Sequence, residues 1–275
     1  MAARREPNAA ACHYHDRGEP GQVTCLGCEG APCDGDGAFE GLVRLPVAIE
    51  TVLLDAGGVL VFPNWERVAD TFARHGLPVS ATALRAAEPE ARFAIDEAHR
   101  VASTSDADRG SLYFRLVLAK AGIPPDAPIQ APLNELWAYH SEHNLWEQVP
   151  DDVVPALERL LALGVRLAVA SNANGALHRM FARVGLARYF HTICDSCVEG
   201  VEKPDRRFFE IVLERAGARP ETAIHVGDLY HVDVVGARNA RLRPVLLDPG
   251  AFYREYDVER VRSLDELVAF VTSEG

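Results

Sequence analysis

The stretch Thr51-Val52-Leu53-Leu54-Asp55-Ala56-Gly57-Gly58-Val59-Leu60 decides the fold expected for this chain. An apolar run typical of a buried strand ends at the carboxylate of Asp55. Gly57 and Gly58 then allow the backbone to fold closely around whatever that carboxylate holds. Taken alone, an aspartate after a strand is more often a turn former or a helix cap. The residues at the ends of the later strands therefore decide whether Asp55 is a nucleophile.

Composition limits the possible classes of protein. The 275 residues can form one large domain with an insertion or two domains, and their 48% hydrophobic content implies a substantial core. A formal net charge of −12 argues against a nucleic-acid partner. No run of about 18 apolar residues occurs, and no apolar segment follows Arg4 and Arg5, so neither a membrane span nor a signal peptide is expected. We expect a cytoplasmic protein, in which the six cysteines are thiols or metal ligands.

Residues 1–45 differ from the rest because they are rich in Gly, Pro, Ala and charge, and they hold four of the six cysteines. Three pairs of ligand-type residues have the two-residue spacing that suits zinc: Cys12 and His15, Cys25 and Cys28, Cys33 and Asp36. This spacing resembles the first three ligand pairs of B-box-like zinc fingers. The resemblance implies one zinc ion on Cys12, His15, Cys25 and Cys28, or on a set with Cys33 and Asp36 in place of the middle pair. The alternatives are a disordered tail and translated sequence upstream of the true start. The protein partner of such a segment is unknown.

Residues 64–150 have the apolar periodicity of helices. The pattern predicts helices from Trp65 to Gly76, from Ser80 toward Val101, over 110–121 and over 133–144, with Pro-rich breaks between them. We interpret Trp137, His140, His143 and Trp146 as packing or rim residues, because aromatic side chains at helical spacing usually serve packing.

From Asp151 onward, helices and strands alternate regularly. Strands are expected at 165–170, 189–194, 223–226 and 244–247, and they follow a first strand at 48–56. Helices are expected between them, including one from about Arg206 to Ala216 and one over 234–240. A last helix is expected at the end of the chain, where Ser263 and Glu266 form a capping box. This alternation indicates an α/β fold with a Rossmann-like parallel sheet and helices on both faces. The sheet would be built by residues 46–63 and 151–275.

Polar residues stand at the expected strand ends, and the carboxyl ends of parallel strands meet at one edge of a sheet. Read together, Asp55-x-Gly57-Gly58-Val59, Ser171, Lys203-Pro204-Asp205 and Gly227-Asp228-x4-Asp233 resemble the four motifs of the haloacid-dehalogenase-like hydrolase superfamily over residues 50–272. The resemblance implies that the helical insertion, residues 64–150, is an α-helical cap domain.

The resemblance also implies a set of roles for phosphoryl transfer. Asp55 would be the nucleophile that takes the phosphoryl group as an aspartyl phosphate. Ser171, Asn172 through its backbone N–H, and Lys203 would bind the phosphoryl oxygens. Mg²⁺ would be held by Asp55, the carbonyl of Gly57 and Asp228, with Asp233 in support, because this ion prefers oxygen ligands. The C-x2-C pair Cys194 and Cys197 is interpreted as incidental.

The chain departs from the family pattern at Gly57, where many members have an aspartate that protonates the leaving group. Such an acid contributes about 10²- to 10⁴-fold in rate. His231 or a residue of the cap could replace it. We predict a Mg²⁺-dependent phosphatase of small phosphorylated metabolites, with Asn64, Trp65 and the cap helices placed to select the substrate. The alternatives are a 2-haloacid dehalogenase and a catalytically weak phosphate-ligand sensor or scaffold.

Overall fold

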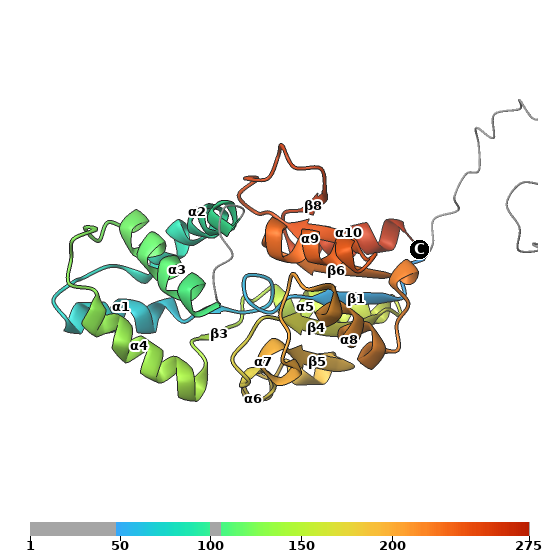
Figure 1. Cartoon of the computed structure of the whole chain (residues 1–275), viewed down its shortest axis with the longest axis horizontal. Helices are drawn as coiled ribbons and strands as arrows, with labels where there is room; N and C mark the ends of the chain where they lie inside the picture. The colour runs from blue at the N-terminus through green and yellow to red at the C-terminus, as the bar shows by residue number, and fades with distance from the viewer. Residues whose placement is uncertain (1–47, 100–105, 275) are drawn as a thin grey trace, which may run out of the picture. The chain divides into compact units, whose positions relative to one another are not determined.

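The computed structural model describes residues 48–99 and 106–274, all of which belong to one compact unit (Figure 1). In its described part, this unit holds a six-stranded parallel sheet and a group of helices inserted after the first strand. The Rossmann-like α/β fold predicted from the sequence is confirmed.

The sheet has the strand order β5-β4-β1-β6-β7-β8, and all its neighbours are parallel. The strands are β1 (Thr51–Leu54), β4 (Arg166–Ser171), β5 (Thr192–Asp195), β6 (Ala223–Gly227), β7 (Arg243–Leu247) and β8 (Glu259–Val261). At the end of β1, Leu54 pairs with Val169 of β4 and Val226 of β6. The chain winds outward in opposite directions from β1 and β6, so the carboxyl ends of the central strands form the edge at which ligands bind in such sheets.

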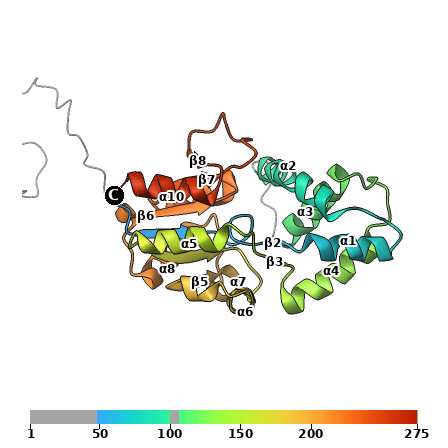
Figure 2. The same cartoon turned by 180° about the vertical axis from the view of Figure 1, so that it is seen from behind.

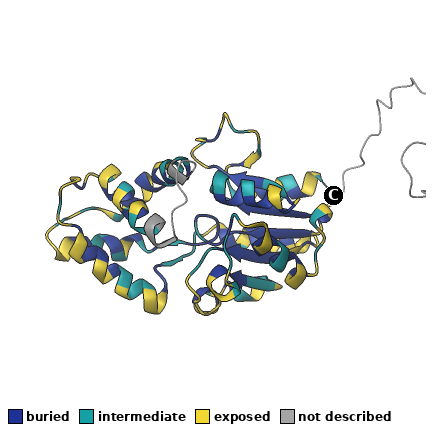
Figure 3. Ribbon diagram, viewed as in Figure 1, coloured by how far each residue is buried: buried dark blue, intermediate teal, exposed yellow. Residues whose placement is uncertain are grey.

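Helices cover both faces of the sheet because successive side chains of a strand point to opposite faces. Val52 and Leu54 of β1 belong to a core that includes α5 (Val153–Ala162), α6 (Leu177–Arg183) and α10 (Leu264–Ser273). Leu53 belongs to a second core, on α8 (Arg206–Ala216) and α9 (Val235–Asn239). Figure 2 shows the sheet from the opposite side, and Figure 3 shows the burial of its interior. Every residue of the central strands β1 and β6 is buried, whereas the edge strand β8 is mostly exposed.

The inserted helices are α1 (Trp65–Arg74), α2 (Ala81–His99), α3 (Asp106–Lys120) and α4 (Gln130–His143). They have a hydrophobic core of their own, in which Trp65, Phe72 and Phe114 are almost fully buried. Side-chain caps start two of them: Asn64 Oδ1 accepts from the N–H of Arg67 at 3.0 Å, and Ser80 Oγ accepts from the N–H of Ala83 at 3.1 Å. The insertion is therefore a helical cluster that can bury its own apolar faces.

A short antiparallel ribbon joins this cluster to the sheet. It pairs β2 (Phe62–Pro63) with β3 (Trp146–Gln148). Glu147 of β3 accepts from the Tyr139 hydroxyl at 2.8 Å and from Asn64 at 3.1 Å, and it pairs with Arg183 of α6 at 2.6 Å. The ribbon was not predicted, because strands of two and three residues are too short to show alternation.

Several boundaries differ from the prediction. The first strand is β1 alone, shorter than 48–56. The strand expected over 189–194 begins only at Thr192, because Tyr189 is the last residue of a 3-10 turn, η1 (Ala187–Tyr189). The helix expected over 234–240 is preceded by a π-helical turn, η3 (Tyr230–Val234). The prediction missed β8 and the short elements α7 (Ser196–Glu199) and η2 (Pro220–Thr222). Such short elements depend on tertiary contacts that no local pattern reveals.

The possible zinc ligands Cys12, His15, Cys25 and Cys28 lie outside the described residues. Within the described residues, none of the helices is long and apolar enough to cross a membrane. The two cysteines that are described, Cys194 and Cys197, are free thiols, of which Cys194 is buried and Cys197 exposed.

Candidate active site

A cavity of about 590 Å³ opens at the carboxyl edge of the sheet and is bounded by both the sheet and the inserted helices. Its wall on the sheet side includes Asp55, Ser171, Asn172, Lys203 and Asp228, which the sequence analysis had singled out. Gly57 also lines it. Asp233 lies just behind this wall and is 1% exposed. The structure therefore brings together residues that are up to 178 positions apart, from Asp55 to Asp233.

Asp55 follows β1 directly and is held by its backbone, since its N–H donates to the carbonyl of Val226 at 2.8 Å. Its Oδ1 accepts from the N–H of Ala56 at 2.7 Å and lies 3.1 Å from Lys203 Nζ. Burial raises the pKa of the Asp55 carboxyl, while Lys203 and a hydrogen bond from Ser171 lower it. The lysine therefore favours the ionised form that a nucleophile needs.

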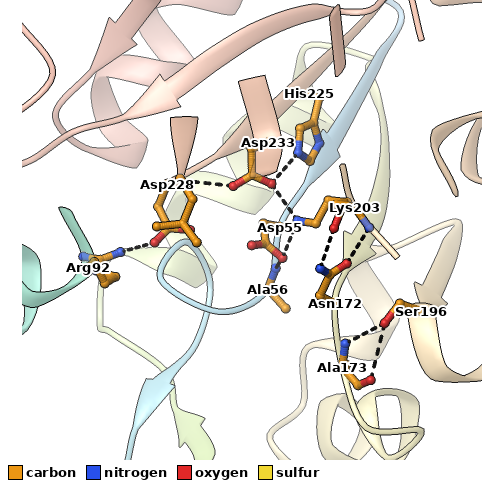
Figure 4. Close-up of polar contacts among 11 residues, drawn as sticks. Asp55, Ala56, Arg92, Asn172, Ala173, Ser196, Lys203, His225, Asp228 and Asp233 are labelled. Carbon is orange, nitrogen blue, oxygen red and sulfur yellow. Dashed lines mark hydrogen bonds and ion pairs between the residues drawn. The ribbon is translucent and has the colours of Figure 1, made fainter. Parts of the chain in front are cut away.

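Lys203 is almost completely buried and lies between two carboxylates (Figure 4). Its Nζ is 2.6 Å from Asp233 Oδ1 and 3.1 Å from Asp55 Oδ1. Burial alone would lower the pKa of this lysine, but the two carboxylates raise it above its usual range. Lys203 is thus a fixed positive charge beneath the cavity.

The side chain of Asn172 serves as a brace for Lys203. Its Nδ2 donates to the Lys203 carbonyl at 3.0 Å, and its Oδ1 accepts from the Lys203 N–H at 2.8 Å. Because both polar atoms of the amide are engaged in this way, the side chain positions the lysine, and the backbone N–H of Asn172 is the group that remains for a substrate.

Three carboxylates lie close together at the carboxyl edge of the sheet. One oxygen each of Asp55, Asp228 and Asp233 lies within 4.8 Å of the others. Burial raises the pKa of Asp228 to about 7, helped by the two neighbouring negative charges and opposed by Arg92. Although burial acts against it, Lys203 together with a hydrogen bond from His225 holds the pKa of Asp233 well below its usual range. Because neighbouring buried carboxylates repel one another, a cation bound between them would be stabilising.

Two glycines allow this close packing. A Cβ at Gly227 would lie 2.1 Å from Asp233 Cγ, so only glycine lets Asp233 fold back against the end of β6. Gly58 has a φ of +79°, and a Cβ there would lie 2.4 Å from both Arg92 Nη1 and Asp228 Oδ2. These positions explain the glycine of the Gly227-Asp228 motif and the second glycine after Asp55.

Helix α2 contributes a positive charge from the opposite side. Arg92 Nη1 donates to Asp228 Oδ2 at 2.7 Å and to the Gly58 carbonyl at 3.1 Å. Its Nε forms an ion pair with Glu88 Oε1 at 3.0 Å, and the same oxygen accepts a hydrogen bond from the Tyr113 hydroxyl at 3.1 Å. A chain of buried polar groups thus runs from the helical insertion to the acidic cluster (Figure 4 shows its Arg92 end).

The space beside Gly57 is occupied by an indole. Gly57 has an ordinary backbone conformation, and a Cβ there would lie 3.5 Å from Trp146 Cδ1 and 3.6 Å from Nε1. Trp137, His140 and Trp146 all line the cavity, which refines their interpretation as packing or rim residues. His231 is not among the residues that line the cavity, although its neighbours Leu229 and Val232 are.

Sequence reasoning missed three further groups around the acidic cluster. His225 is fully buried in β6, and its Nε2 lies 2.9 Å from Asp233 Oδ1. Arg92 and Glu88 lie on α2 and reach the site only through the fold. A charged pair at positions i and i+4 of a helix normally indicates a solvated surface pair, so no sequence signal distinguished it.

The comparisons with known proteins agree with this geometry. A family profile described as haloacid dehalogenase-like hydrolase matches residues 49–241, which is more than half of the chain. The chain therefore belongs to the haloacid dehalogenase-like hydrolases.

Individual relatives are similar to it at moderate identity. A glyceraldehyde 3-phosphate phosphatase of Methanopyrus kandleri is 29% identical over 167 residues, which span 57% of this chain and 71% of the relative. A ribulose-1,5-bisphosphate 5-phosphatase of Halopiger xanaduensis is 33% identical over 141 residues, which span 50% of this chain and 57% of the relative. The magnesium-bound hydrolase YfnB of Bacillus subtilis has a TM-score of 0.60 at 18% identity, covering 82% of this chain and 99% of YfnB, and shares the fold.

Proposed function

We propose that this hydrolase is a phosphomonoesterase of small phosphorylated metabolites that acts through an aspartyl phosphate on Asp55. The observation that carries the proposal is the meeting of Asp55 with Lys203, Asp228 and Asp233 at the carboxyl edge of the sheet. The phosphatase names of the Methanopyrus and Halopiger relatives support it.

The nucleophile and the phosphoryl-binding groups would have separate roles in the reaction. The Asp55 carboxylate attacks phosphorus, the bond to the leaving oxygen breaks, and water later hydrolyses the aspartyl phosphate to free phosphate. Ser171, the backbone N–H of Asn172 and the Lys203 ammonium would stabilise the negative charge on the phosphoryl oxygens. The lysine is already aligned, since its Nζ lies 3.1 Å from the nucleophile.

Magnesium fits the acidic cluster. The three carboxylates offer hard oxygen ligands within 4.8 Å of one another, and burial raises the pKa of Asp55 and Asp228 without a further cation. Asp55, Asp228 and the Gly57 carbonyl would hold the ion, with Asp233 in support. Bound there, Mg²⁺ would neutralise charge on the phosphoryl group.

Residues 46–63 and 151–275 would be the catalytic core, and residues 64–150 a cap that selects the substrate. Tyr113, Trp137 and Trp146 of the cap line the cavity, so side chains of the cap are placed to contact the leaving group. Asn64 is engaged in a helix cap and a bond to Glu147, and Trp65 is 1% exposed. Substrate selection is therefore assigned to the aromatic residues of the lining instead of Asn64 and Trp65.

The test is turnover of a panel of phosphate monoesters with and without Mg²⁺. Wild-type protein should hydrolyse members of the panel only with Mg²⁺, and Asp55→Asn should lower the rate by about 10³-fold or more, because an amide is a poor nucleophile. Asp265→Asn, which removes an exposed carboxylate on α10, is the control and should keep full activity. Near wild-type turnover by Asp55→Asn would refute the proposal.

The same panel separates the alternatives. A 2-haloacid dehalogenase would release halide from 2-haloacids without Mg²⁺, and the buried pair Asp228 and Asp233 gives such a reaction no advantage. A sensor would show thermal stabilisation by phosphate esters with no turnover.

Zinc binding by the N-terminal segment stays a prediction, as does cytoplasmic location. Metal analysis of the whole chain should find about one zinc per chain, because Cys and His ligands select this metal. Removal of residues 1–42 should abolish zinc binding and leave phosphatase activity.

A further inference from the structure

Helix α2 contacts the core through three residues on one face, and two of them, Arg92 and Asp96, reach the acidic loop, the segment from Asp228 to Asp233. Arg92 pairs with Asp228 at 2.7 Å. Phe93 packs against Tyr253 with ring centroids 5.0 Å apart. Asp96 is 0% exposed and reaches the backbone after Asp228. The insertion therefore touches the loop that carries Asp228 at several points.

Asp96 accepts three hydrogen bonds from the core. Its Oδ2 accepts from the N–H of Tyr230 at 2.8 Å and from the Tyr253 hydroxyl at 3.0 Å. Its Oδ1 accepts from the N–H of His231 at 3.0 Å. Tyr230 and His231 are the first two residues of the turn η3, whose leading N–H groups have no partner inside the turn. Asp96 thus acts as the N-terminal cap of η3.

This cap differs from those of α8 and α10 in coming from a distant part of the chain. Asp205 caps α8 and Ser263 caps α10, each from the position just before its helix. The corresponding residue of η3 is Leu229, which has no side chain that can accept a hydrogen bond. The cap comes instead from a residue 134 positions earlier in the chain.

The turn η3 carries Asp233 and begins two residues after Asp228. Asp233 Oδ2 accepts from the N–H of Leu229 at 3.0 Å, and the Asp233 N–H donates to the Leu229 carbonyl at 2.8 Å. One carboxylate therefore holds the start of the turn from the core side, and Asp96 holds it from the side of α2. Loss of Asp96 would leave two N–H groups without their partner where the acidic loop begins its turn.

We propose that Asp96 is a positioning residue, through which the helical insertion holds the segment from Asp228 to Asp233 in the geometry that binds Mg²⁺. Docking of α2 and metal binding are then coupled, and each strengthens the other to the same extent. The inference rests on the proposed function only in taking Asp55, Asp228 and Asp233 as the metal site.

The experiment is a calorimetric titration of the full chain with MgCl₂. Asp96→Ala should raise the Kd for Mg²⁺ about 3- to 30-fold. This range is expected if the free energy lost with a helix cap weakens metal binding by a similar amount. Asp96→Asn keeps one acceptor oxygen and should show a smaller rise. Tyr253→Phe keeps both backbone bonds and should show the smallest.

Ser263→Ala is the matched control, because it removes the cap of α10 away from the cavity. It should lower the melting temperature and leave the Kd unchanged. A folded Asp96→Ala with the wild-type Kd overturns the inference. If Asp96→Ala does not fold, equal Kd values for wild type, Asp96→Asn and Tyr253→Phe overturn it.

The result also separates this inference from the proposed function. Wild-type turnover with Mg²⁺, together with an unchanged Kd in the Asp96 variants, refutes the role of Asp96 alone. Absence of Mg²⁺ binding by the wild-type chain refutes the inference together with the metal site of the proposed function.

Discussion

The two walls of the cavity are formed by different kinds of structural element. The wall on the sheet side consists of residues that end strands or begin the following turns, such as Asp55, Ser171 and Asp228. The wall formed by the inserted helices, called the cap side after the proposed role of the insertion, includes residues of α2, α3 and α4, such as Arg92, Tyr113 and His140. The first wall supplies charge at fixed positions, and the second supplies aromatic surface and one buried arginine.

The difference shows how each wall depends on the fold. A strand end fixes its residue through the sheet register, so the order of motifs along the chain predicts which side chains meet. A helix residue reaches the cavity only when its helix packs at a particular angle and rotation. We therefore expect substitutions on the sheet side to affect chemistry and stability together, and substitutions on the cap side to affect specificity or the response to metal.

The largest effect is expected from Lys203→Met. This change leaves the carboxylates of Asp55 and Asp233 buried without their shared cation, which should lower the free energy of unfolding by about 3–5 kcal/mol. Phosphatase activity should be lost as well. Chemical denaturation in metal-free buffer measures the first effect, and turnover with Mg²⁺ measures the second.

A surface lysine provides the control for Lys203. Lys120→Met removes a partner of Glu90 at 2.5 Å in a more exposed pair and should cost less than about 1 kcal/mol. Adding Asp233→Asn to Lys203→Met should restore part of the stability and none of the activity. Equal stability of Lys203→Met and wild type would show that the ammonium does not neutralise the buried carboxylates.

A smaller effect is expected from Arg92→Met on the cap side. Asp228 loses its partner, so the metal-free protein should become less stable by about 1–3 kcal/mol. Saturating MgCl₂ should reduce this loss, because another cation then faces Asp228. Arg85 lies on the same helix as Arg92 and forms an exposed pair with Glu66 of α1, so Arg85→Met should show neither effect. A loss that is the same with and without Mg²⁺ would contradict the assignment of Asp228 as a metal ligand.

The next effect concerns the leaving group. Gly57 supplies no acid, and Trp146 lies beside it, so phenolate leaving groups should depart faster than alkoxides by about 10²-fold or more. The comparison needs phosphate esters of similar size and single-turnover kinetics that isolate the chemical step. Gly57→Asp should reduce the difference in rate between aryl and alkyl esters, because the new carboxyl can protonate the leaving group. The backbone at Gly57 has no positive φ, so an aspartate fits there without backbone strain. Equal single-turnover rates for alkyl and aryl esters would mean that another residue acts as the acid.

The smallest effect is a pH dependence of stability at Asp96. Burial raises the pKa of this carboxyl to about 6, above its unfolded value. An acid whose pKa is higher in the folded state than in the unfolded state stabilises the fold fully below about pH 4. This stabilisation is lost as the pH rises from about 4 through about 6. Relative to Asp96→Asn, the wild type should therefore lose about 1–3 kcal/mol between these pH values. Urea unfolding in EDTA measures the difference, and parallel pH profiles of the two proteins would contradict it.

Most of the sheet and the charged wall could be predicted from the sequence. The helix α8 has the predicted bounds, Arg206–Ala216, because Asp205 caps it and Gly217 ends it with a left-handed backbone. The ribbon β2 with β3 and the strand β8 could not be predicted, because segments of two or three residues carry no periodic signal. Their pairing arises from the packing of the whole chain.

The same distinction holds within the site. Asp55, Lys203, Asp228 and Asp233 are brought together as the motif order predicts. Asp96 could not be identified, because an acidic residue in the second half of a helix normally indicates a solvated face. Its partners lie 134 and 135 residues away, and only the packed structure shows that its carboxylate caps another helix.

The central claim is that Asp55 receives the phosphoryl group, and trapping of that acyl phosphate tests it most directly. The full chain is mixed with a substrate from the panel and Mg²⁺, quenched in acid during turnover, reduced with borohydride, digested and sequenced by mass spectrometry. The account predicts reductive modification at Asp55 alone, absent from Asp55→Asn and from protein quenched before substrate is added. Modification at another carboxylate, or none at Asp55 in protein that was turning over when quenched, would contradict the account.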